Sequence, residues 1–177
     1  MRYIYLLLVI LMIGCTKTQS NTSFGYHWIT QPVNIKFSGC SIQEIELITS
    51  ALEKTNHLDF KYNISDKSPN IEIKSYQGAW TKSSSSSPTA EDNIGGRTDM
   101  KVKGAEINSV TIWMNSYILE DNGGYPTVFQ SVFLHEYGHA MGMIHSNDSQ
   151  GIMNVNNPWK GLEFYSQKEI NMINERY

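Results

Sequence analysis

A short segment of the chain places imidazoles and a carboxylate at spacings that suit a metal ion. Residues 135–145 read HEYGHAMGMIH. His135 and His139 are four residues apart, so on a helix both imidazoles project from one face, one turn apart. Glu136 follows at a neighbouring angle, where its carboxylate can lean over the open side of a metal without binding it. This arrangement predicts two metal ligands and a candidate general base.

A third imidazole follows where the helix is expected to end. Gly142 can adopt a left-handed conformation and turn the chain, which brings His145 back toward His135 and His139. Three neutral imidazoles on one Zn²⁺ leave a fourth position for water, and that open geometry is typical of a catalytic site. The chain has only 5 histidines among 177 residues. An accidental match has odds on the order of one in 10⁵, so we favour a zinc site over a helix of solvated histidines.

Helices are expected where they would position these residues. The pattern predicts a helix from about residue 126 to residue 141, which carries the first two histidines and ends at Gly142. Two further helices begin at capping boxes, in which a serine is followed three residues later by a glutamate. These pairs are Ser41 with Glu44, and Ser166 with Glu169.

The rest of the chain predicts a sheet. Alternating apolar residues indicate five strands, with one long polar loop and one turn between them. Together with the helices, the strands predict one α+β domain. The strands are expected at residues 31–37, 58–62, 70–76, 97–102 and 109–115, the loop at 77–96 and the turn at 121–124.

The motif HEYGHAMGMIHS resembles the consensus H-E-x-x-H-x-x-G-x-x-H of the metzincin zinc metallopeptidases. Ser146, directly after the third histidine, is typical of the matrixin branch of that family. Met153 lies eight residues after His145, at a matrixin-like distance for the Met-turn whose methionine underlies the imidazoles. The resemblance covers roughly residues 30–177. It implies a metzincin-like catalytic domain, a twisted five-stranded mixed sheet with three helices and a C-terminal subdomain after the zinc motif.

The resemblance implies a zinc-dependent endopeptidase acting on a protein or peptide substrate. One catalytic Zn²⁺, held by His135, His139 and His145, would polarise a bound water. Glu136 would accept the proton of that water and pass it to the leaving amine. The peptide would add as a strand along residues 97–102, and residues 155–162 would wall the pocket beside the zinc.

Some features depart from the animal matrixins. No segment resembles their cysteine-switch propeptide, and the two remaining histidines, His27 and His57, are too few for a second, structural zinc. Asn154 and Val155 replace the Tyr-Pro that follows the methionine in many matrixins, which leaves the pocket wall open to question and provides no tyrosine ligand. Residues 121–124 offer oxygen atoms to Ca²⁺, although an ordinary turn explains them better.

Two other functions stay open at this point. One is a lipid-tethered surface binding module that keeps a non-catalytic zinc. The other is a zinc hydrolase that acts on cell-wall peptides. The motif does not favour the binding module, because a closed structural site has no use for Glu136, whereas the choice of substrate separates the two peptidases.

The amino terminus resembles a bacterial lipoprotein signal. Arg2 precedes an apolar run at residues 3–13, which is too short to span a membrane comfortably. The sequence Met-Ile-Gly-Cys at residues 12–15 resembles a lipobox, in which Cys15 is lipidated. We therefore expect a signal peptide at residues 1–14, a tether at 15–29 and the matrixin-like domain at 30–177. This predicts a protein anchored by lipid in the bacterial cell envelope, facing the periplasm or the exterior; the alternative is a secreted protein.

Composition excludes several classes of protein. A net charge of −3, with no basic stripe, argues against nucleic-acid binding. Two cysteines cannot form a disulfide framework. Cys40 is expected to be a small buried residue rather than a reactive thiol. Nothing in the sequence indicates the oligomeric state.

Overall fold

The structure is a computed structural model that describes residues 25–76, 95–121 and 125–177. The expected signal peptide, Cys15, most of the expected tether and loop, and residues 122–124 of the expected turn lie outside these ranges. Among the described residues, none of the helices has the length and apolar character needed to cross a membrane.

The described chain forms five strands, four α-helices and one short 3₁₀ helix. In chain order they are β1 (Val33–Ser38), α1 (Ile42–Glu53), β2 (Tyr62–Ile64), β3 (Ile71–Tyr76), β4 (Gly96–Lys103), β5 (Glu106–Asn115), α2 (Ser116–Asp121), α3 (Thr127–Ala140), the 3₁₀ helix η1 (Pro158–Lys160) and α4 (Gln167–Arg176).

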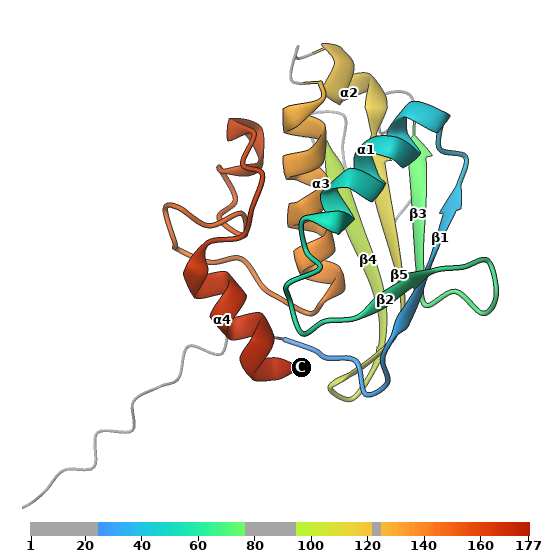
Figure 1. Cartoon of the computed structure of the whole chain (residues 1–177), viewed down its shortest axis with the longest axis vertical. Coiled ribbons are helices and arrows are strands. Elements are labelled where there is room, and N and C mark those ends of the chain that lie inside the picture. The colour runs from blue at the N-terminus through green and yellow to red at the C-terminus, as the bar shows by residue number, and fades with distance from the viewer. Residues whose placement is uncertain (1–24, 77–94, 122–124) are drawn as a thin grey trace, which may run out of the picture.

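The strands form one mixed sheet in the order β2-β1-β3-β5-β4. Strands β2, β1, β3 and β5 are parallel to one another. Strand β4 lies at one edge and runs antiparallel to β5. Figure 1 shows α1 and α3 on one face of this sheet and α4 beyond α3, in the C-terminal segment. This confirms the predicted fold class.

The core lies between the sheet and the helices that cover it. Alternate residues of the central strands point to this side, and Ile71 and Ile73 of β3 are fully buried there. Helix α3 contributes Phe133 and Tyr137, whose rings stack with centroids 5.7 Å apart. Its side chains are buried almost all round, so α3 is fixed rigidly and can position a site.

The expected boundaries of α3 and of the capped helices are confirmed. Helix α3 begins directly after Pro126 and ends at Ala140. Gly142 has φ of +93°, the left-handed conformation that its position required. Both α1 and α4 begin with complete capping boxes.

The strand predicted at residues 58–62 is wrong. Leu58 and Phe60 are buried in the core, but they lie in the loop that follows α1, where Leu58 N–H donates to the carbonyl of Thr55. Their alternation reflects insertion of these two side chains into the core and not hydrogen bonding to a neighbouring strand. The second strand, β2, is shorter and later, and within the described part of the chain its one partner is β1.

One helix was not predicted. Helix α2 follows β5 without a loop, so the described chain has four α-helices and not three. The Asn115 side chain caps its start by accepting from Ile118 N–H at 3.3 Å, a role that asparagine commonly fills. Its Leu119 is fully buried, so tertiary packing stabilises a helix too short to be stable alone.

Candidate metal centre

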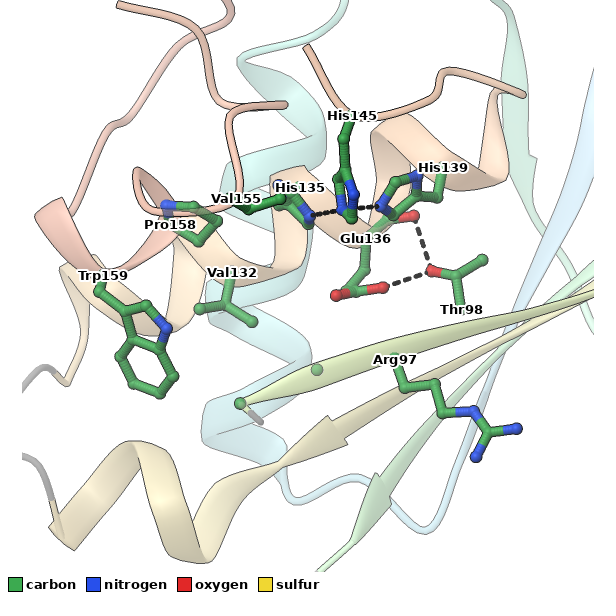
Figure 2. Close-up of a pocket in the computed structure, with 12 residues that line it drawn as sticks. Arg97, Thr98, Val132, His135, Glu136, His139, His145, Val155, Pro158 and Trp159 are labelled. Atoms are coloured by element: carbon green, nitrogen blue, oxygen red, sulfur yellow. Dashed lines mark hydrogen bonds between the residues drawn. The ribbon is translucent and has the colours of Figure 1, made fainter. Parts of the chain in front are cut away.

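The structure brings the three predicted imidazoles together. His135 and His139 project from the same face of α3, and His145 reaches them from the loop that follows. The Nε2 atom of His145 lies 3.2 Å from Nε2 of His135 and 3.1 Å from Nε2 of His139 (Figure 2). Within the described residues, these three form the one group of three or more histidine, cysteine or acidic side chains that could hold a metal.

Two of the imidazoles are oriented by backbone carbonyls. His135 Nδ1 lies 2.8 Å from the carbonyl oxygen of Ile152, and His139 Nδ1 lies 2.8 Å from that of Met143. A carbonyl only accepts hydrogen bonds, so each Nδ1 donates. The lone pair of each Nε2 atom therefore faces the centre of the cluster, which is the arrangement found in metal-binding histidines.

The imidazoles are held in the neutral form that binds metals. Burial lowers the pKa of His135 to about 4. Burial also lowers the pKa values of His139 and His145. Metal binding requires this deprotonated form, so the electrostatic environment suits a cation at the cluster.

The donor set fits zinc. Lone pairs on neutral nitrogens repel one another at 3.1–3.2 Å unless a proton or a cation lies between them. Tetrahedral zinc with Zn–N bonds of about 2.0–2.1 Å spaces its nitrogen ligands about 3.3 Å apart. The observed spacing is close to that value, and nitrogen is a preferred zinc ligand.

A left-handed turn and the amino-terminal segment direct the chain toward His145. A Cβ at Gly142 would lie 2.1 Å from the carbonyl oxygen of Tyr26, so the two backbones approach as closely as only glycine permits. Carbonyl groups at the end of α3 also find partners far away in the sequence. Trp28 Nε1 donates to Ala140 O at 2.8 Å, and Tyr177 Oη donates to Met141 O at 2.6 Å. These contacts fix the end of the helix from which the third imidazole is delivered.

Met153 lies directly against α3. A Cβ at Gly138 would be 2.2 Å from its sulfur, so the absence of a side chain at Gly138 makes room for the thioether. The neighbouring Ile152 supplies the carbonyl that orients His135. Met153 therefore packs on the helix that carries the imidazoles.

Glu169 of α4 holds this turn in place. Its fully buried carboxylate accepts from Met153 N–H at 2.7 Å and from Ile152 N–H at 3.1 Å. The sequence pattern indicates for Glu169 only the second position of a capping box. The contacts with the turn depend on tertiary packing, for which the local sequence has no signal.

Glu136 extends from α3 toward β4 (Figure 2). It is 7% exposed, and burial raises its pKa to about 7 against the opposing hydrogen bond from Thr98. Thr98 Oγ1 lies 2.7 Å from Glu136 Oε2. A Cβ at Gly96 would lie 2.7 Å from Glu136 Cγ, so the strand leaves room for this side chain only because residue 96 is glycine.

An open pocket of about 380 Å³ contains the cluster and Glu136. One wall is the start of β4, the strand expected to border the site, and the floor is α3. The opposite wall comes from residues 155–162, which were expected to form it, and includes Val155, Pro158 and Trp159. Arg97 lines the mouth, but its side chain leads away from the histidines (Figure 2) and pairs with Asp99 at 2.6 Å.

Comparison with known families decides the classification. The sequence profile described as Matrixin matches residues 41–177. The chain belongs to the matrixin family. Family membership and the fold support a zinc metallopeptidase, and the histidine triad could bind its zinc. Among curated protein sequences, none matches this chain.

Solved structures share the fold of this matrixin domain at low sequence identity. One structure of myroilysin has a TM-score of 0.54 at 15% identity, covering 87% of this chain and 80% of that chain. A second myroilysin structure has a TM-score of 0.50 at 14% identity, covering 89% and 86%. Archaemetzincin from Archaeoglobus fulgidus, complexed with malonate, has a TM-score of 0.47 at 14% identity, covering 80% and 99%.

Two other candidate positions lie away from the pocket. Cys40 is half-buried, with Sγ 3.6 Å from the carbonyl oxygen of Ile73, and burial raises the pKa of its thiol. A protonated, partly buried thiol is a poor nucleophile. Asp121 ends α2, while the rest of the turn considered for Ca²⁺ lies outside the described residues.

Proposed function

We propose that this protein is a zinc-dependent endopeptidase, with His135, His139 and His145 as the zinc ligands and Glu136 as the general base. The observation that supports this most is the meeting of three converging Nε2 atoms with a buried carboxylate in one open pocket. A purely structural zinc site would be closed and would need no such carboxylate.

Each side chain has a distinct part in the proposed reaction. Zinc bound by the three imidazoles would supply a Lewis acid that polarises a water molecule and the carbonyl of the scissile peptide bond. Glu136 accepts a proton from the attacking water and donates it to the departing amine nitrogen, so the proton is conserved. With a pKa raised to about 7, its carboxyl can take up and release a proton near neutral pH.

The proposed substrate is an extended peptide that lies along β4. Among the described strands it lies at the edge of the sheet, with β5 as its neighbour on one side. An edge strand offers backbone groups to a peptide that adds as a further strand. Val132, Val155 and Trp159 give the pocket an apolar wall, which favours an apolar side chain next to the scissile bond.

Glu136→Gln tests the assignment of the base with the least change in shape. We expect kcat for peptide hydrolysis to fall by about 10²–10⁴-fold, because the amide cannot accept the proton. Zinc should still bind, since the imidazoles are unchanged. Chelation of the wild-type protein should abolish hydrolysis, and added Zn²⁺ should restore it. An unimpaired Glu136→Gln enzyme would refute the role of Glu136.

The choice of substrate separates this proposal from the two alternatives. Zinc-loaded wild-type protein should cleave casein or a peptide library. Hydrolysis of murein peptides alone would indicate the cell-wall enzyme. Failure with both substrates, despite bound zinc, would favour the binding module.

The proposed location is the bacterial cell envelope, with Cys15 carrying the lipid. Support comes from the lipobox-like sequence at residues 12–15. Mass spectrometry of the mature protein should find a lipidated Cys15 at the amino terminus, and Cys15→Ser should release the protein from membranes. An unmodified amino terminus cut elsewhere would favour secretion.

A further inference from the structure

The carboxylate of Glu136 is fixed from the side of the sheet by a residue that has no part in the metal-binding motif. Thr98 is the third residue of β4 and is paired with Ile112 of β5. Its Oγ1 lies 2.7 Å from Glu136 Oε2 and 2.9 Å from the main-chain oxygen of Glu136. These are the contacts in Figure 2 between the strand and the glutamate.

The chemistry of a hydroxyl group decides which contact is stronger. Thr98 has one O–H hydrogen, so it can donate fully to only one of the two oxygens. A hydrogen bond to an ionised carboxylate is stronger than one to a neutral carbonyl. The hydroxyl therefore favours Glu136 Oε2 when the carboxylate is charged, with the carbonyl as its second acceptor.

The surroundings leave the carboxylate little freedom. Gly96, two residues before Thr98, brings the strand backbone within contact of Glu136 Cγ. Thr98 is β-branched and sits in a paired strand, so its own side chain has few rotamers. The contact from the strand holds Oε2, and among the residues that the structure describes no hydrogen bond reaches Oε1.

We propose that Thr98 is a positioning residue that holds the general base Glu136 by its Oε2 atom and thereby presents Oε1 to the attacking water. This inference rests on the proposed function, because it assumes that Glu136 is the base. It extends that function because the contact that orients the base comes from the edge strand β4 and not from α3.

Thr98→Val is the decisive variant, because it keeps the shape of the side chain and removes the hydroxyl. We expect kcat to fall about tenfold, since a misplaced catalytic group reduces the rate steeply, while KM and zinc affinity stay unchanged. Thr98→Ser retains the hydroxyl and should keep kcat within about threefold of wild type. If Thr98→Val does not fold, Thr98→Ala removes the same hydroxyl without adding a methyl group.

Thr111→Val serves as the matched control. Thr111 lies in the neighbouring strand β5, opposite Asp99, and does not line the pocket. This variant makes the same chemical change in the same sheet and should leave kcat at the wild-type value. It therefore separates the loss of a contact with Glu136 from a general effect of valine in a strand.

A second readout does not depend on turnover. In zinc-loaded protein labelled with ¹³C, the carboxylate resonance of Glu136, assigned with Glu136→Gln, should move in Thr98→Val and stay in place in Thr111→Val. Wild-type kcat in Thr98→Val, or an unmoved resonance, would overturn the positioning role. A wild-type protein that binds zinc without cleaving any peptide would instead overturn the proposed function, and the resonance would still report on the contact.

Discussion

Two helices of this protein begin with the same capping box but use it differently. In α1, Ser41 N–H donates to Glu44 Oε2 at 2.5 Å; in α4, Ser166 N–H donates to Glu169 Oε2 at 2.8 Å. Both glutamates are buried, at 3% and 0% exposure. A residue chosen to cap a helix on the surface would not need such burial, so each carboxylate has a second task.

The second tasks differ in the kind of partner. Glu44 Oε1 accepts hydrogen bonds from the hydroxyls of Ser75 and Ser116, which tie α1 to β3 and α2. Glu169 instead accepts from the backbone N–H groups of Ile152 and Met153. Hydroxyls can rotate and become acceptors, whereas a backbone N–H can only donate. One capping box therefore stabilises the fold, and the other also sets the position of His135 through Ile152.

Glu169→Gln should have the larger effect of the two substitutions. A glutamine has one acceptor oxygen, so its NH₂ group must face at least one buried backbone N–H that Glu169 now satisfies. Breaking such a charge-assisted contact costs about 3 kcal/mol of unfolding free energy. Because the turn that orients His135 would shift, zinc affinity should fall about 10–100-fold. Urea unfolding and competition with a chelator measure the two effects.

An unchanged zinc affinity in Glu169→Gln would contradict a role of Glu169 in positioning His135. It would mean that the turn at Met153 keeps its place through packing against Gly138 alone. The stability loss would remain, but the two capping boxes would then be equivalent in function.

The sequence predicted the capping boxes because they are local. Ser41 and Glu44 lie within one helical turn, and their pattern is visible without knowledge of the fold. The same holds for the histidines on α3 and for the turn at Gly142, where spacing along the helix and the conformational freedom of glycine determine the geometry.

Contacts between distant segments could not be predicted in this way. Thr98 lies 38 positions from Glu136, and a threonine in a strand is explained fully by its propensity for strands. The contacts of Glu169 with the turn had no local signal for the same reason. The strand predicted at residues 58–62 was wrong for a related reason. Leu58 and Phe60 alternate with polar residues because they are buried in the core, and a local pattern cannot tell this from pairing in a sheet.

Glu44→Gln should reduce stability without affecting the metal centre. The amide oxygen can accept from Ser41 N–H while the NH₂ group donates to the hydroxyls, which then rotate to accept. We expect a loss of about 1–2 kcal/mol in unfolding free energy and unchanged zinc affinity. A weakened zinc site in this variant would show that α1 also positions the histidines.

The acid response should distinguish Glu44 further. Burial alone would raise the pKa of Glu44, but hydrogen bonds from Ser116, Ser75 and Ser41 outweigh it and hold the pKa below the usual value for glutamate. A lowered folded-state pKa means that the carboxylate stabilises the fold fully above the unfolded pKa. This contribution is lost as the pH falls through the folded pKa.

The free-energy difference between wild type and Glu44→Gln should therefore shrink on acidification. Urea unfolding at about pH 6 and about pH 3 measures it, the two values lying on either side of the unfolded pKa. A difference that is constant across this interval would mean that the folded-state pKa of Glu44 is not lowered.

The serines of the two capping boxes provide the smallest and most selective test. Ser41→Ala and Ser166→Ala each remove a cap bond and should each cost about 1 kcal/mol in unfolding free energy. Ser166→Ala should cost slightly more, because Ser166 Oγ also donates to Asp148 Oδ2 at 2.8 Å. Both variants should bind zinc as tightly as wild type, since Glu169 keeps its contacts with the turn. If Ser166→Ala weakened zinc binding as much as Glu169→Gln, the start of α4 and not the carboxylate itself would control the position of His135.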